Sequence, residues 1–186
     1  KQYEQRVLEH PYDYDGWFDL LRMEEDLLRV DDSGVEDSRV ENAQPSRLER
    51  VRDAYERAIA NVPPTKTDKR QWRRYIYLWL FYALFEEQTC DDISRAVEVL
   101  ETAVKLIPHH TFTFAKVWIA LSDVHIRRGD LRQARLTLGQ ALGRCPKPRL
   151  FKHYTDMELK LCEFERVRTI YERWLDCEQG KSAMVW

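Results

Sequence analysis

The sequence predicts an all-α fold, an α-α superhelix (solenoid) built from consecutive helical hairpins. Residues recur at the 3.6-residue period of a helix, as in the stripe formed by Trp79, Tyr82, Ala83 and Glu86. The same two helical patterns return several times along the 186 residues, as they do in repeat proteins. Six glycines and seven prolines are few for this length, and this scarcity suits long helices joined by short turns.

The repeating unit contains two helical patterns. In the first, an aromatic residue is followed three residues later by Tyr or Leu and four residues after that by Glu. It occurs at Trp17/Leu20/Glu24, Trp79/Tyr82/Glu86 and Phe151/Tyr154/Glu158, and at Trp118/Leu121/His125 with histidine in the acidic position. In the second, Tyr or Leu is followed four residues later by an aliphatic residue and eight residues later by proline. It occurs at Tyr3/Val7/Pro11, Tyr55/Ile59/Pro63, Leu100/Val104/Pro108 and Leu138/Leu142/Pro146, and at Tyr171/Leu175 without the proline. From Trp79 on, where no insert intervenes, the Glu or His of the first pattern lies 13 or 14 residues before the start of the second, a register that chance would not preserve.

In chain order, these patterns predict helices at about 1–10, 14–29, 46–61, 68–88, 92–106, 111–128, 130–144, 148–161 and 164–177. Asp91 or Asp92 is available as the N-cap of the fifth helix, and Gly129 has the position of a C′ glycine. The array then divides into the end of a preceding repeat (1–13), repeats at 14–64, 65–110, 111–147 and 148–178, and the start of a further repeat (179–186). The chain is therefore expected to be an interior fragment of a longer repeat protein.

An acidic insert at about 26–47 interrupts the repeat at 14–64. It carries serine and few large apolar groups, a composition typical of a disordered surface loop. A docking or phosphorylation loop is the other interpretation, because an added phosphate could bind a basic neighbour.

Two basic clusters are the candidate contacts for partner proteins or RNA. Arg70, Arg73, Arg74 and Tyr77 share one helical face, which could be a solvated surface, a phosphate contact or a dock for an acidic helix. The second cluster, Arg144, Lys147, Arg149 and Lys152, flanks a turn, where cations also complement a helix dipole. Net charge is −2, with an acidic first third and a basic middle, so no overall preference for polyanions is visible.

The sequence gives little support for an enzyme. His109, His110 and His125 fit structural positions, and no metal-ligand motif, phosphate loop or nucleophile elbow is present. We expect no catalytic residue, no cofactor, no metal, no small-molecule substrate and no membrane span. The repeated Glu24, Glu86 and Glu158 are expected to be structural, pairing with a second-helix arginine such as Arg52 or Arg168.

The repeat differs from the tetratricopeptide consensus, which has a Leu-Gly pair and no acid in its first helix. Trp-x-x-Tyr-Ala-x-x-Glu at Trp79–Glu86, with Arg-x-x-Tyr-Glu-Arg at Arg52–Arg57 and Arg168–Arg173, resembles the half-a-TPR (HAT) repeat. The runs Arg70–Glu87, Leu106–Ile119 and Gly143–Tyr154 resemble the crooked neck family of splicing factors. The chain departs from that pattern at His125, Val97 and Phe151 and in the acidic insert.

This resemblance implies a non-enzymatic nuclear scaffold in pre-mRNA splicing, within the nineteen-complex-associated core of the spliceosome. The implied partners are other HAT-repeat scaffolds and the Myb-type splicing factor, with indirect or weak contact to snRNA or pre-mRNA. Two alternatives stay open: a module that binds RNA through the Arg70–Arg74 face, and a HAT scaffold of mRNA 3′-end processing.

Overall fold

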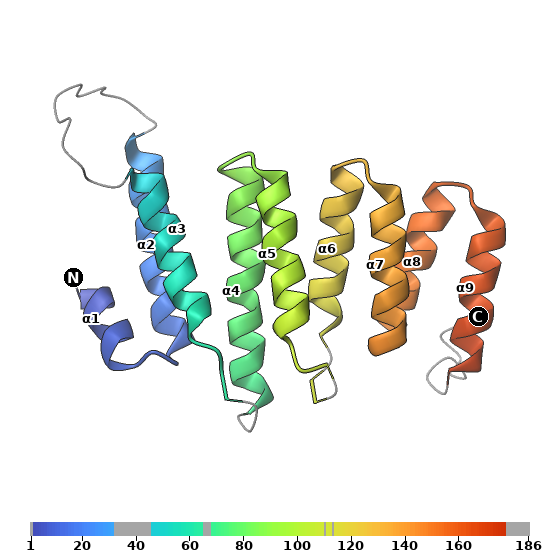
Figure 1. Cartoon of the computed structure of the whole chain (residues 1–186), viewed down its shortest axis with the longest axis horizontal. Helices are drawn as coiled ribbons and strands as arrows, with labels where there is room; N and C mark the ends of the chain where they lie inside the picture. Colours follow the sequence, from blue (N-terminus) through green and yellow to red (C-terminus); the bar gives the residue numbers. More distant parts are fainter. Residues whose placement is uncertain (1, 32–45, 65–67, 110, 113, 178–186) are drawn as a thin grey trace. The chain divides into compact units, whose positions relative to one another are not determined.

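Consecutive α-helices form the whole regular structure of the described residues. The computed structural model describes residues 2–31, 46–64, 68–109, 111–112 and 114–177 (Figure 1). The helices are α1 (Gln2–Glu9), α2 (Tyr14–Asp31), α3 (Arg47–Ala60), α4 (Lys69–Gln88), α5 (Ile93–Leu106), α6 (Ala115–Arg127), α7 (Leu131–Arg144), α8 (Pro148–Lys160) and α9 (Phe164–Asp176). The predicted all-α class of helical hairpins is confirmed for these residues. No described helix is long and apolar enough to cross a membrane.

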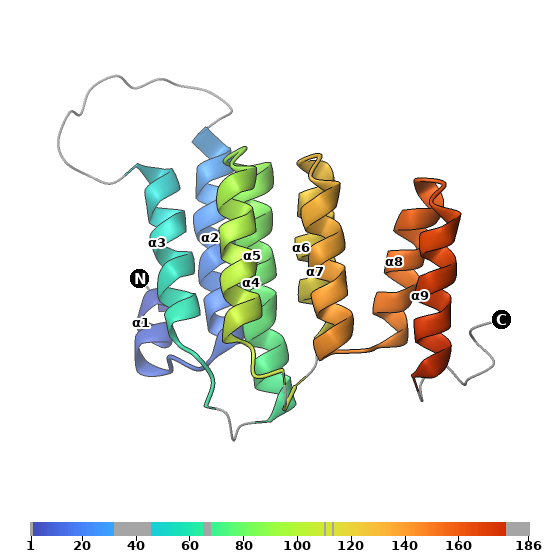
Figure 2. The ribbon, with the colours of Figure 1, turned by 45° about the vertical axis from the view of Figure 1, so that its right-hand side comes forward.

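The chain divides into two compact units, Lys1–Tyr82 and Ala83–Trp186, and the division falls within α4. The first unit contains α1, the α2–α3 pair and most of α4. The second contains the last six residues of α4, together with α5, the α6–α7 pair and the α8–α9 pair. Both views show α2 beside α3 and α8 beside α9, each pair antiparallel (Figures 1 and 2). The repeat boundaries drawn from the sequence remain predictions.

Side-chain caps fix several of the helix starts. The Ser46 hydroxyl accepts from the backbone of Glu49 while the Glu49 carboxylate accepts from the backbone of Ser46, a reciprocal capping box at α3. Asp92, not Asp91, caps α5, with its carboxylate 2.9 Å from the amide nitrogen of Arg95. Asp130 caps α7 in the same way through Gln133. Each cap satisfies a backbone donor that the helix leaves unpaired.

The three hairpin turns of the second unit share one backbone conformation. Asp91, Gly129 and Cys162 each have a positive φ, at 53°, 84° and 58°. The next residue then donates its amide to the carbonyl of the glutamate or histidine of the first-helix pattern. These bonds are Asp92 to Glu86 (2.8 Å), Asp130 to His125 (2.9 Å) and Glu163 to Glu158 (3.0 Å). The predicted C′ role of Gly129 is confirmed, whereas an aspartate and a cysteine take the left-handed position in the other two turns.

Helix α6 differs most from its predicted bounds, because it begins at Ala115 rather than near residue 111. The amides of Thr111 and Phe112 both donate to the Pro108 carbonyl, so this segment forms a turn. Phe114 then precedes the helix with an extended backbone (φ −120°, ψ 95°) and no side-chain cap. The remaining helix ends lie within about two residues of the predictions, which is the ordinary uncertainty of helix ends.

Stacked aromatic side chains join neighbouring helices in both units. Tyr55 of α3 stacks on Tyr82 of α4, with ring centroids 4.9 Å apart and planes 9° apart. In the second unit Phe151 of α8 stacks on Trp174 of α9, with ring centroids 5.4 Å apart and planes 4° apart. Because large side chains interlock between them, neighbouring helices bury apolar side chains against each other.

Some predicted features lie outside the described residues. These are the central part of the acidic insert (32–45), the start of a further repeat (179–186) and His110.

Candidate protein-docking surface

The aromatic positions of the repeat pattern belong to the core. Trp17, Trp79, Trp118 and Phe151 are all buried. The Trp17 indole donates to the Pro11 carbonyl at 2.9 Å, which ties α2 to the preceding turn. Of the other pattern residues, Tyr55, Pro63, Tyr82 and Leu121 are buried, Pro108, Tyr154 and Tyr171 are half-buried, and Pro146 is exposed. These side chains therefore hold the hairpins together and offer little surface to a partner.

The repeated glutamates are buried and lie close to arginines. Glu86 and Glu158 are both 0% exposed. Glu24 lies 3.3 Å from Arg50 on the next helix, and Glu86 lies 3.1 Å from Arg95 on the next helix. A carboxylate buried in this way needs a cation or hydrogen-bond donors, because transfer out of water disfavours its charge. The three glutamates are thus part of the packing, although Glu24 also lines a cavity beside Arg50.

Glu158 of α8 pairs across two hairpins. Its two oxygens lie 2.8 and 2.9 Å from the Nε and Nη2 atoms of Arg135, which is on α7 of the preceding hairpin. Hydrogen bonding to Glu158 raises the pKa of the Arg135 guanidinium. The expected ion pair between Glu158 and Arg168 is wrong, since Arg168 lies 3.4 Å from Glu165 within its own helix. A bidentate pair of this kind fixes both distance and orientation between α7 and α8.

Of the three histidines considered in the sequence analysis, His109 and His125 are described, and neither lies in a catalytic arrangement. His109 Nε2 lies 2.8 Å from the Val104 carbonyl, and the centroid of its ring lies 5.3 Å from that of Trp118. His125 is buried in α6. Burial lowers the pKa of both histidines, so both are neutral near pH 7. Among the described residues, no group of three or more His, Cys, Asp or Glu side chains could hold a metal ion.

The basic face predicted on α4 is only partly open. Arg74 lies 3.3 Å from Asp15 of α2, and Tyr77 is half-buried. Arg70 is highly exposed and lies 3.9 Å from Asp68. Arg73 is exposed and makes no ion pair within the described ranges. An ion pair with an aspartate lowers the positive potential that a phosphate would meet, so the face is weaker for nucleic acid than its sequence indicates.

The second basic cluster is spread over a helix junction. The Arg144 guanidinium lies over the Trp118 ring at 5.9 Å, a cation–π contact. Lys147 is the N-cap residue of α8, and its side chain makes no capping hydrogen bond. Arg149 and Lys152 are exposed on α8. The cluster therefore gives α8 an exposed basic start but no enclosed anion site.

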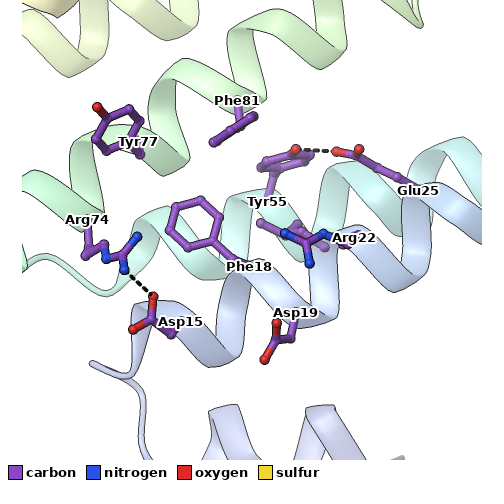
Figure 3. A pocket seen from close by; sticks show the side chains of 10 residues that line it. Asp15, Phe18, Asp19, Arg22, Glu25, Tyr55, Arg74, Tyr77 and Phe81 are labelled. Carbon is purple, nitrogen blue, oxygen red and sulfur yellow. Dashed lines mark hydrogen bonds and ion pairs between the residues drawn. The ribbon is translucent and has the colours of Figure 1, made fainter.

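A groove in the first unit is a concave feature lined by described side chains. It has a volume of about 430 Å³ and lies between α2 and α4, with Tyr55 of α3 at its inner wall (Figure 3). Its lining consists of Asp15, Phe18, Asp19, Leu21, Arg22, Glu25, Tyr55, Arg74, Tyr77 and Phe81. Arg74 and Tyr77 were predicted partner contacts, and the structure brings them together with α2 residues from a different part of the chain.

Aromatic side chains form the middle of this groove. Phe18 and Phe81 meet edge to face with centroids 5.7 Å apart. Phe81 nevertheless stays 47% exposed. The Tyr55 hydroxyl donates to the Glu25 carboxylate, and burial together with this bond raises the pKa of Tyr55. An apolar centre with charged edges is the composition of a protein-binding site.

Phe18, Arg22 and Phe81 are among the groove residues that were not recognised from the sequence. A signal for Phe81 existed, since it lies four residues after Tyr77 and outside the buried stripe of Trp79 and Tyr82. Arg22 gave no comparable signal, because a single arginine in an amphipathic helix is typical of any solvated face.

Comparison with known proteins shows close relatives. Pre-mRNA-splicing factor clf1 of Aspergillus fumigatus is 48% identical over 97% of this chain. Crooked neck-like protein 1 of Homo sapiens is 45% identical over 94% of it, and protein crooked neck of Drosophila melanogaster is 44% identical over 94%. The chain spans only 24%, 18% and 22% of the length of those three proteins. No family model matches the chain. Over this segment, the chain is a homologue of the crooked neck family of pre-mRNA splicing factors.

Proposed function

We propose that this chain is a segment of a non-enzymatic scaffold that holds protein partners in the spliceosome during pre-mRNA splicing. The observation that carries the proposal is the likeness to splicing factors over nearly the whole chain, joined to a fold of consecutive helical hairpins. Stacked hairpins bury their repeated residues against each other and leave long helix faces for binding.

The scaffold acts in the nucleus, where its relatives' named process takes place. Its partners are proteins of the nineteen-complex-associated core, including the Myb-type splicing factor and other HAT-repeat scaffolds. Placement of the buried glutamates and histidines in the core supports a binding role over a catalytic one. The observed pairing of Arg74 with Asp15 favours protein docking over RNA binding at the α4 face.

Capture from nuclear extract tests the proposal. The tagged chain is incubated with extract, washed and analysed by mass spectrometry. We expect spliceosomal proteins to be enriched over a tag-only control, and the capture to survive nuclease treatment. Recovery of chaperones with acidic C-terminal peptides, without spliceosomal proteins, would contradict the scaffold role. Recovery of 3′-end processing factors instead would assign the chain to that machinery.

A salt titration separates protein docking from RNA binding. Each phosphate contact on a single strand contributes a slope of about −0.7 in log affinity against log salt. If the α4 face bound RNA, changing Arg70, Arg73 and Arg74 to glutamine would reduce that slope by about two units. We expect weak RNA binding that the triple variant leaves unchanged. Tight binding at physiological salt that the variant loses would favour the RNA alternative.

A further inference from the structure

We propose that the groove between α2 and α4 binds an amphipathic helix of a partner protein. The helix inserts a large apolar side chain beside Phe81 and places a carboxylate against Arg22. This inference rests on the proposed function, because it gives the chemistry of one partner that such a scaffold holds.

The shape of the groove favours a helix. The lining positions on α2 run from Asp15 to Glu25 with helical spacing, and those on α4 are Arg74, Tyr77 and Phe81. Ten residues at 1.5 Å each give a length of about 15 Å, or nearly three turns. The contacts Asp15–Arg74 and Phe18–Phe81 show that the two helices lie side by side and run in the same direction. Two neighbouring ridged faces leave a channel into which the apolar stripe of a third helix can pack.

The centre of the groove supplies the apolar contact. Phe18 supports one edge of the Phe81 ring, yet almost half of Phe81 remains exposed to water. Leu21, which is buried, adds apolar surface to the lining of the groove. An exposed aromatic side chain flanked by charged residues is the common anchor point of protein interfaces, because burial there removes apolar surface from water.

The charges at the edges determine the polarity of the partner. Asp15 pairs with Arg74 at 3.3 Å, Asp19 lies 3.4 Å from Arg6, and Glu25 accepts from Tyr55. Arg22 is exposed and has no hydrogen-bond or ion-pair partner in the described parts of the chain. The one unmet charge in the lining is therefore a guanidinium, which binds a carboxylate through two parallel hydrogen bonds. The three lining carboxylates disfavour a polyphosphate chain in the same place.

A display selection with a charge-reversed variant tests this inference. The probe is a phage library of alanine-based helices of about 18 residues, roughly five turns, randomised along one face. The target is the full 186-residue chain. We expect the selected helices to carry Phe, Leu or Trp with Asp or Glu one turn away. Selection on Arg22→Glu should replace that acid by Lys or Arg.

Affinity measurements then use matched controls. A helix selected on the unchanged chain should bind Arg22→Glu and Phe81→Ala at least about tenfold more weakly, a difference of about 1.4 kcal/mol. Arg132→Glu and Phe164→Ala change an exposed arginine and an exposed phenylalanine of the second unit. Both controls should bind the helix within about twofold of the unchanged chain. Circular dichroism of all four variants should show unchanged helicity, because each replaced side chain is exposed.

The results distinguish this inference from the proposed function. The groove assignment is overturned if no helix is enriched, if the selected helices carry no acid, if Arg22→Glu binds as well as the unchanged chain, or if RNA displaces the helix. In that case capture of spliceosomal proteins by the unchanged chain would still support the scaffold. If the unchanged chain captures none, the proposed function fails whatever the library yields.

Discussion

The Arg135–Glu158 pair should contribute more to stability than the other ion pairs of the second unit. Changing Arg135 to Met keeps an unbranched apolar stem but leaves a carboxylate that is 0% exposed without its cation. Loss of one partner of a buried pair costs about 3–5 kcal/mol. Arg135 is itself 24% exposed, so water reaches that end of the pair and we expect a loss of about 2–4 kcal/mol. The contact with the more exposed Glu163, at 3.9 Å, adds little.

Urea unfolding at pH 7, followed by far-ultraviolet circular dichroism, measures this loss. Arg50→Met is the matched control, since Arg50 is 48% exposed and its partner Glu24 is 11% exposed. That pair should be worth less than about 1 kcal/mol. The double variant Arg135→Met/Glu158→Leu should recover most of the lost stability, because it buries no charge. If Arg135→Met cost no more than Arg50→Met, the bidentate geometry would not be stabilising the α7–α8 contact.

Two further predictions concern the core and its histidines. Trp79→Ala should lower the free energy of unfolding by about 3–5 kcal/mol, measured in the same urea titration, and a loss under about 1 kcal/mol would show that Trp79 contributes little to the packing. His125, whose neighbours include Glu101, Asp130 and Arg128, has a pKa below that of an unfolded histidine, so the unfolded chain binds its proton first as pH falls. Stability should therefore be full above about pH 6.5 and decline below it, by at most about 1.4 kcal/mol per pH unit for this histidine. His125→Gln should flatten that decline in thermal melts recorded between pH 5 and 8, and an equal slope in both proteins would contradict the assignment.

The fold was predictable because helix packing repeats its requirements along the sequence. A buried stripe needs an apolar residue each turn, so the spacing of Trp79 and Tyr82 indicates a helix without knowledge of its neighbour. The start of α6 was missed because the apolar residues Phe112 and Phe114 continue the helical pattern in a segment that turns. Local spacing does not reveal that the Pro108 carbonyl already accepts two amides there.

The ion-pair partners were less predictable, since they depend on how one helix faces another. Arg52 and Arg168 share the position three residues before the second-helix Tyr, and this position was expected to hold the partner. Glu24 and Glu86 approach arginines five residues before it, Arg50 and Arg95. Glu158 reaches back to Arg135 on the preceding hairpin. Interhelical geometry, rather than sequence spacing alone, therefore selects the partner of each glutamate.

The same reasoning explains why the groove was only half anticipated. A residue that recurs in every hairpin serves what every hairpin shares, which is packing against its neighbours, and the buried aromatics and glutamates fit that role. A binding surface must distinguish one partner from another, so its residues belong to single copies. Phe18, Arg22 and Phe81 have no counterpart in the repeat pattern. In the proposed scaffold, repetition identifies the core, whereas exposed residues that interrupt the repetition identify the proposed binding groove.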